Sequence, residues 1–177
     1  IARNKNILFH SDAVQALGKI YINVDETPID FLSMSAHKLY GPKGIGALYK
    51  RRGSKLEPLI HGGGQESNLR ASTENIGGIG GFGMAAELST SKLNENTDHI
   101  LCLESYFLNL LNEQNISYTI NGTKRIPGVF NITFHGVNGQ NLILQLDFSG
   151  IGISFGSACS SGTVIASEML IAMGITK

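Results

Sequence analysis

Short apolar runs separated by polar and glycine-rich turns fill the first half of the chain. These runs predict strands over residues 7–9, 31–34 and 45–49, the first of them buried. Between the first two runs, residues 13–18 predict one or two helical turns closed by Gly18. Short strands that alternate with helical turns are typical of an α/β sheet that carries functional residues at its strand ends.

The second half of the chain has a different pattern. An amphipathic helix is predicted to begin at Asp98, with an apolar face formed by Ile100, Leu103, Phe107, Leu110 and Leu111. The pattern further predicts strands over 129–134 and 150–155, and helices over 140–146 and about 167–173. We therefore expect an α/β fold in two parts, residues 1–92 and residues 93–177.

Lys38 is the first candidate for chemistry. It follows the apolar run 31–34 and precedes a turn at residues 41–44, which places it at a strand end. Apolar surroundings would lower the pKa of its ammonium group and make the amine a nucleophile that can form a Schiff base. The alternative is an ordinary surface lysine, since lysine is almost never buried without a partner.

Asp12 and Gln15 are candidates upstream of this lysine. They are three residues apart and share a helical face, next to Lys38 if the two preceding strands are parallel neighbours. Asp12 is otherwise placed to be a helix N-cap. A lysine, a carboxylate for a pyridine nitrogen, and phosphate donors such as Ser35 and His37 together form the set that pyridoxal phosphate requires.

The two cysteines lie in different settings. Cys159 follows the predicted strand 150–155 within a run of small residues, 156–162, and this setting favours a reactive thiol over a buried one. Cys102 falls within a helical period and is predicted to be structural. Such a pair does not suggest a disulfide framework and fits a reducing compartment, so we expect a cytoplasmic protein.

Charge and composition narrow the function further. The formal net charge is zero, which gives no electrostatic reason to expect nucleic acid or an anionic membrane as a partner. No apolar run approaches membrane-spanning length, no targeting peptide is recognised at the start, and the scattered histidines do not predict a metal site. Residues 78–83 match a dinucleotide-binding glycine pattern but follow no strand, so a closely packed, glycine-rich helix start is favoured.

Five segments carry a resemblance to a known family. The chain resembles the NifS-like cysteine desulfurases at residues 10–15, 33–44, 61–66, 69–75 and 156–162. The resemblance implies a fold-type I pyridoxal phosphate enzyme, in which residues 1–92 are the C-terminal portion of the cofactor-binding large domain, with a mixed, mostly parallel sheet. Residues 93–177 would be most of the small domain. Because the family pattern extends beyond both ends, the 177 residues alone are expected to be inactive.

The resemblance also implies a role for each candidate residue. Lys38 would bind the cofactor covalently, Asp12 would hold its pyridinium nitrogen, and Gln15 would contact its ring hydroxyl. Ser35 and His37 would bind its phosphate, and Thr73 would reach the phosphate in the other subunit of a homodimer. Cys159 would accept sulfur as a persulfide. The roles of His61 and Arg70 stay open between a turn, a surface position and a phosphate or subunit contact.

The implied reaction removes sulfur from L-cysteine and leaves L-alanine and a Cys159 persulfide. A sulfur-acceptor protein, either an iron-sulfur scaffold or a tRNA-thiolation protein, would then take the sulfur. The alternatives are another fold-type I enzyme, such as a selenocysteine lyase or an aminotransferase, and an inactive part of such an enzyme. An aminotransferase would have no need of Cys159.

Overall fold

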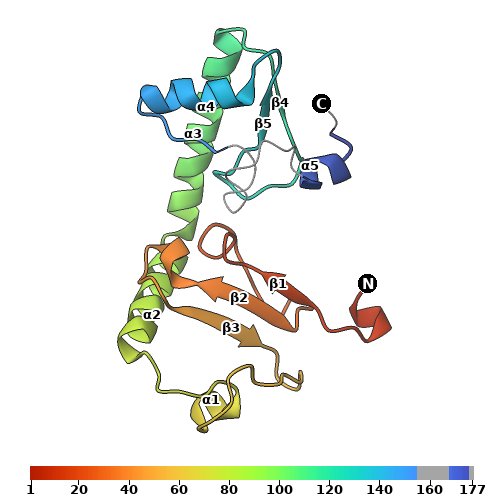
Figure 1. Ribbon diagram of the computed structural model, residues 1–177, viewed down its shortest axis with the longest axis vertical. Coiled ribbons are helices and arrows are strands. Elements are labelled where there is room, and N and C mark those ends of the chain that lie inside the picture. Colours follow the sequence, from red (N-terminus) through yellow and green to blue (C-terminus); the bar gives the residue numbers. More distant parts are fainter. Residues whose placement is uncertain (155–167, 176–177) are drawn as a thin grey trace. The chain divides into compact units, whose positions relative to one another are not determined.

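The computed structural model describes residues 1–154 and 168–175. The chain divides into two compact units, Ile1–Leu103 and Glu104–Lys177, and each is described by itself (Figure 1). This boundary falls inside a helix, eleven residues after the domain boundary expected at 92/93 (103 − 92 = 11). The domain assignment itself stays a prediction, because compactness does not show that a unit folds alone.

The first unit contains a three-stranded mixed sheet in the order β1-β2-β3. Strand β1 (His10–Asp12) runs parallel to β2 (Phe31–Ser35), and β2 runs antiparallel to β3 (Gly46–Lys50). The expected α/β fold with a mixed sheet is therefore confirmed.

The strands predicted over 31–34 and 45–49 are confirmed to within one residue, but the strand predicted over 7–9 is wrong. Pairing begins where the Phe9 carbonyl accepts from Phe31 N, and the assigned strand starts at His10. Ile7 and Leu8 are more than half exposed. A strand buried on both faces needs a second layer, and no described residue covers this stretch.

The helical turns predicted after β1 are present. The Leu17 amide donates to the Ala13 carbonyl, and Gly18 ends the turns with φ +74°, in the left-handed region that glycine favours. Ala13 is buried in a small core with Ile29 and Leu32. This packing fixes the start of the turns directly behind the end of β1.

A second core lies beneath the 3-10 helix η2 (Ala36–Leu39), which follows β2 directly. Ala36 and Leu39 of η2 pack against Phe82 and Ala85 of α2 (Ile76–Ser91). The short helices η1 (Arg3–Lys5) and α1 (Gln65–Asn68) complete the elements described before α2.

The glycine-rich segment 78–83 lies inside α2, not in the strand-to-helix loop that a dinucleotide site would need. Close packing, the favoured interpretation, is observed at Gly81. A Cβ atom at Gly81 would meet Pro42 Cγ at 2.5 Å, so only glycine lets α2 approach this turn.

The second unit begins within α3 (Leu93–Glu113) and adds α4 (Gly139–Phe148) and α5 (Glu168–Ala172). An antiparallel hairpin joins β4 (Tyr118–Ile120) to β5 (Ile132–Phe134). The helices α4 and α5 lie where they were expected, whereas α3 begins at Leu93 and not at Asp98. The strand expected over 129–134 is shortened to β5. Strand β4 was not expected, and residues 151–154 form no strand, contrary to the prediction for 150–155.

Candidate active site

The first two candidate residues stand at the same edge of the sheet. Asp12 is the last residue of β1, and Ser35 is the last residue of β2. Because these strands are parallel and Asp12 is in register with Ser33, both carboxyl ends point to one edge. Strands β1 and β2 are thus parallel neighbours, which was the condition for Asp12 to lie near Lys38.

Helix η2 carries the next two candidates beyond that edge. A 3-10 helix has three residues per turn, so Ala36 and Leu39 share a face, and both are buried. His37 and Lys38 therefore lie on the opposite face and are exposed. The expectation that Lys38 occupies apolar, buried surroundings is wrong for the described residues, because η2 buries its neighbours instead.

Hydrogen bonds orient four of the candidate side chains, those of Asp12, Gln15, Ser35 and His37. Ser35 Oγ and His37 Nδ1 are 2.8 Å apart. Asp12 Oδ1 accepts from the Val14 amide at 2.8 Å, which caps the turns that follow β1, as the alternative interpretation of Asp12 expected. Gln15 Oε1 accepts from Lys19 Nζ at 3.2 Å.

Three polar atoms at this edge remain available to bind a ligand. Within the described part of the chain, Asp12 Oδ2, His37 Nε2 and Lys38 Nζ have no hydrogen-bond partner. An oriented carboxylate, an imidazole nitrogen and an amine at one strand edge suit a ligand that presents a protonated ring nitrogen, a phosphate and an aldehyde. The donor set of this structure therefore fits pyridoxal phosphate.

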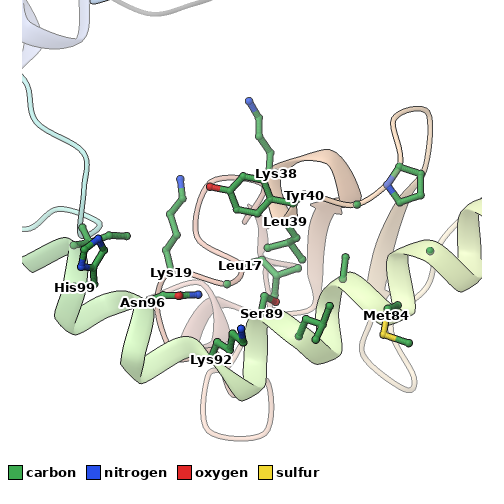
Figure 2. Close-up of a pocket in the computed structure, with 17 residues that line it drawn as sticks. Leu17, Lys19, Lys38, Leu39, Tyr40, Met84, Ser89, Lys92, Asn96 and His99 are labelled. Carbon is green, nitrogen blue, oxygen red and sulfur yellow. The ribbon is translucent and has the colours of Figure 1, made fainter.

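Two recesses flank this edge without joining into one enclosed pocket. A recess of about 260 Å³ lies beside Asp12, Ser11 and Tyr21. A larger groove of about 840 Å³ is lined by Lys38, Leu39 and the facing side of α2. Figure 2 shows Leu17 and Leu39 pointing into this groove, whereas the amine of Lys38 points away from the helix. No lining residue is common to both recesses.

Thr73 lies elsewhere in the first unit, between α1 and α2, and its side chain is exposed. It makes no hydrogen bond with Asp12, Ser35 or His37 in the described structure. Its proposed role toward a second subunit therefore stays a prediction. Arg70, left open by the sequence, donates from Nη1 to the carbonyls of Ser72 and Thr73.

Cys159, predicted to be catalytic, lies outside the described residues. Cys102 lies in α3 as its helical period indicated, but its side chain is exposed. Among the described residues, no group of three histidine, cysteine or acidic side chains is placed to hold a metal ion. None of the helices in that part of the chain has the length and apolar character needed to cross a membrane.

One contact near the site was missed by the sequence analysis. His10 Nε2 and Ser33 Oγ are 2.7 Å apart, and this contact links β1 to β2 two residues before Asp12. The sequence could have indicated that His10 lies on the same face of the strand as Asp12, because residues i and i+2 of a strand share a face. The register between the two strands could not be known from the sequence.

Comparisons with known proteins identify the fold and the family of the chain. The likeness to solved NifS-like structures places the fold among the fold-type I pyridoxal phosphate enzymes. The family model described as Aminotransferase class-V matches residues 1–175, so the chain belongs to the class-V aminotransferase family. This family and its cysteine desulfurase members depend on pyridoxal phosphate.

Individual relatives sharpen the family relationship. The chain is 45% identical to the cysteine desulfurase IscS of Dictyoglomus turgidum and 43% identical to that of Methanosarcina thermophila, in each case over 99% of this chain. These matches cover 45% and 44% of the relatives, so the chain spans about half the length of the curated proteins that it matches.

Solved structures give the same picture. A NifS-like protein matches 98% of this chain and 45% of its own with a TM-score of 0.84 at 36% identity. A NifS-like protein from Rickettsia africae matches 99% of this chain and 46% of its own, also with a TM-score of 0.84, at 31% identity.

Proposed function

We propose that the protein containing this chain is a pyridoxal phosphate-dependent cysteine desulfurase. It removes sulfur from L-cysteine and yields L-alanine and a persulfide on Cys159. The observation that carries the proposal is the 45% identity to a cysteine desulfurase along 99% of the chain. The polar edge formed by Asp12, Ser35, His37 and Lys38 supports it, because these groups fit the cofactor.

Four side chains of one subunit would hold the cofactor in this proposal. Asp12 would pair with its ring nitrogen and keep that nitrogen protonated, while the Gln15 amide would contact the ring hydroxyl. Ser35 and His37, whose Oγ and Nδ1 atoms are 2.8 Å apart, would together bind the phosphate. Thr73 reaches the phosphate of the neighbouring subunit in a homodimer.

When bound, pyridoxal phosphate supplies a conjugated ring that takes up the electron pair left on the substrate Cα after proton removal. The amine of Lys38 would hold the cofactor at its aldehyde and, once the substrate amine has displaced it, would be free to remove that proton as a general base. Its exposure leaves the amine accessible at the end of η2. Lys38 therefore supplies both an anchor and a proton acceptor.

The thiolate of Cys159 attacks the sulfur of L-cysteine, because the thiolate is the nucleophilic form of a thiol. The bond between the substrate sulfur and Cβ breaks, a sulfur–sulfur bond forms, and Cβ gains a proton. L-cysteine and one thiol thus become L-alanine and one persulfide, with all atoms accounted for. A cytoplasmic acceptor protein, of iron-sulfur assembly or tRNA thiolation, takes the terminal sulfur.

Replacing Cys159 tests this proposal in the protein that contains the chain. With L-cysteine and a thiol reductant, Cys159→Ser is expected to reduce sulfide and L-alanine release to background. Cys102→Ser is the matched control and is expected to keep full activity, because Cys102 is an exposed helical residue.

Undiminished sulfide release by Cys159→Ser would contradict the desulfurase mechanism. Release of amino groups to a 2-oxo acid acceptor, independent of Cys159, would favour an aminotransferase. Turnover of L-selenocysteine alone, with L-cysteine unchanged, would favour a selenocysteine lyase.

A further inference from the structure

The side chain of Arg70 forms hydrogen bonds with the backbone on both sides of Thr73, one of the predicted site residues. Its Nη1 donates to the carbonyl of Ser72 at 3.0 Å and to the carbonyl of Thr73 at 3.5 Å, the second bond being long. These carbonyls belong to the two peptide groups that flank the Cα of Thr73. A single guanidinium nitrogen thus bridges the backbone across the position of Thr73.

The backbone at this point has an uncommon conformation. Ser72 has φ +86°, in a region that a residue with a side chain rarely adopts. Such a conformation persists when surrounding contacts hold it. Among the described residues, no group other than Arg70 donates to the carbonyl of Ser72 or of Thr73.

The segment is anchored on either side of this bridge. Ala71 is 5% exposed, and its amide donates to the Ile60 carbonyl at 3.2 Å. Asn75 caps α2, with its Oδ1 accepting from the Gly78 amide at 3.0 Å. Thr73 lies exposed between these anchors, and its own carbonyl is held by Arg70.

We propose that Arg70 is a positioning residue for Thr73. By fixing the two flanking peptide groups, Arg70 holds the Thr73 hydroxyl in place to donate to the phosphate of pyridoxal phosphate. Arg70 acts through Thr73 and does not itself contact the phosphate. This inference rests on the proposed function, which assigns a phosphate to Thr73.

Affinity for two forms of the cofactor tests this role in the protein that contains the chain. Arg70→Met is expected to weaken pyridoxal phosphate binding roughly three- to tenfold, the range for loss of one modest hydrogen-bonding contribution. Binding of pyridoxal, which lacks the phosphate, is expected to be unchanged. Thr73→Val is expected to show the same selectivity, and the double variant to bind no more weakly than Thr73→Val.

Two further variants control for charge and folding. Arg70→Lys keeps the charge but loses the planar donor fork, and we expect an intermediate loss. Arg52→Met removes an exposed arginine with no hydrogen bond among the described residues, and we expect unchanged affinities.

Several outcomes would overturn the inference. Equal loss for pyridoxal and pyridoxal phosphate would indicate general destabilisation, and additive losses in the double variant would indicate direct contact of Arg70 with the phosphate. An unchanged affinity in Arg70→Met or Thr73→Val would also contradict it. If the unsubstituted protein bound no pyridoxal phosphate, the proposed function would fail first, and the inference would fail with it.

Discussion

Glu104 is a charged residue that is only 6% exposed. Its carboxylate accepts two hydrogen bonds from Arg125, at 2.7 and 2.9 Å, and another from the Gly128 amide. The Arg125 guanidinium lies 4.2 Å from the centre of the Phe130 ring. These contacts fasten α3 to the segment before β5 within the second unit.

The hydrogen bonds from Arg125 lower the pKa of Glu104, and the bond from Gly128 acts in the same direction against the opposing effect of burial. A carboxyl group with a lowered pKa in the folded state contributes stability that is fully present above its pKa in the unfolded chain. That contribution is lost as the pH falls through the lowered folded pKa. The second unit should therefore lose stability in acid.

Glu104→Gln should show this contribution directly. Because it leaves Arg125 half-buried without its anion, we expect a loss of about 2 to 4 kcal/mol in unfolding free energy at neutral pH. Near pH 3 the difference from the unsubstituted protein should shrink. Urea unfolding at both pH values measures it, and Glu113→Gln, an exposed glutamate of the same helix, is the control. Equal effects of the two substitutions at both pH values would contradict the assignment.

At the scale of single residues, the sequence predicted which residues lie at strand ends better than it predicted their burial and their hydrogen-bond partners. Asp12 was expected just beyond a strand over 7–9, and it is instead the last residue of β1, so its place at a strand end was right although the strand's bounds were not. The exposure of Lys38 was not predicted, since it depends on which face of η2 meets α2. Arg125 follows Glu104 by 21 residues, and no local pattern marks so distant a partner.

At the scale of elements, the packing of α2 on the turn after η2 depends on one glycine. Gly81 faces the rigid ring of Pro42, whereas the neighbouring Gly80 has no described atom within 4 Å of a Cβ built there. Both lie in the interior of α2, where alanine is otherwise favoured over glycine by about 1 kcal/mol. The two positions therefore separate helix propensity from packing.

We expect Gly80→Ala to stabilise the protein by up to about 1 kcal/mol. Gly81→Ala should instead destabilise it by about 1 to 3 kcal/mol, because Pro42 must shift to admit a methyl group. Thermal or urea unfolding of the two variants measures the contrast. A stabilising Gly81→Ala would show that the approach of α2 to Pro42 is not needed.

The helices α3 and α4 and the five-residue strands were predicted, but the three-residue strands were missed or given wrong bounds. The helices α3 and α4 carry apolar residues at helical spacing, and both are present. Strand β4 spans only three residues, but residues 116–120 alternate apolar and polar side chains (Ile, Ser, Tyr, Thr, Ile), a strand signal that the sequence analysis missed. Residues 7–9 are apolar enough for a strand, yet pairing with β2 starts only at the Phe9 carbonyl.

At the scale of the whole molecule, family membership was recognisable because several moderate motifs occur in the family's order. The class-V match over residues 1–175 confirms that interpretation. The described residues supply an edge of polar groups and two separate recesses, not an enclosed site. The sulfur acceptor stayed open between an iron-sulfur scaffold and a tRNA-thiolation protein, because residues that mark a cofactor site carry no information on a docking surface for a protein.

The central claim is that sulfur from L-cysteine is transferred to Cys159 with the help of Lys38. Mass spectrometry of the protein that contains this chain, after brief exposure to L-cysteine without reductant, tests it most directly. The peptide with Cys159 should gain the mass of one sulfur atom, the peptide with Cys102 should not, and Lys38→Ala should abolish the gain. No added sulfur on Cys159, or an equal addition in Lys38→Ala, would contradict the account.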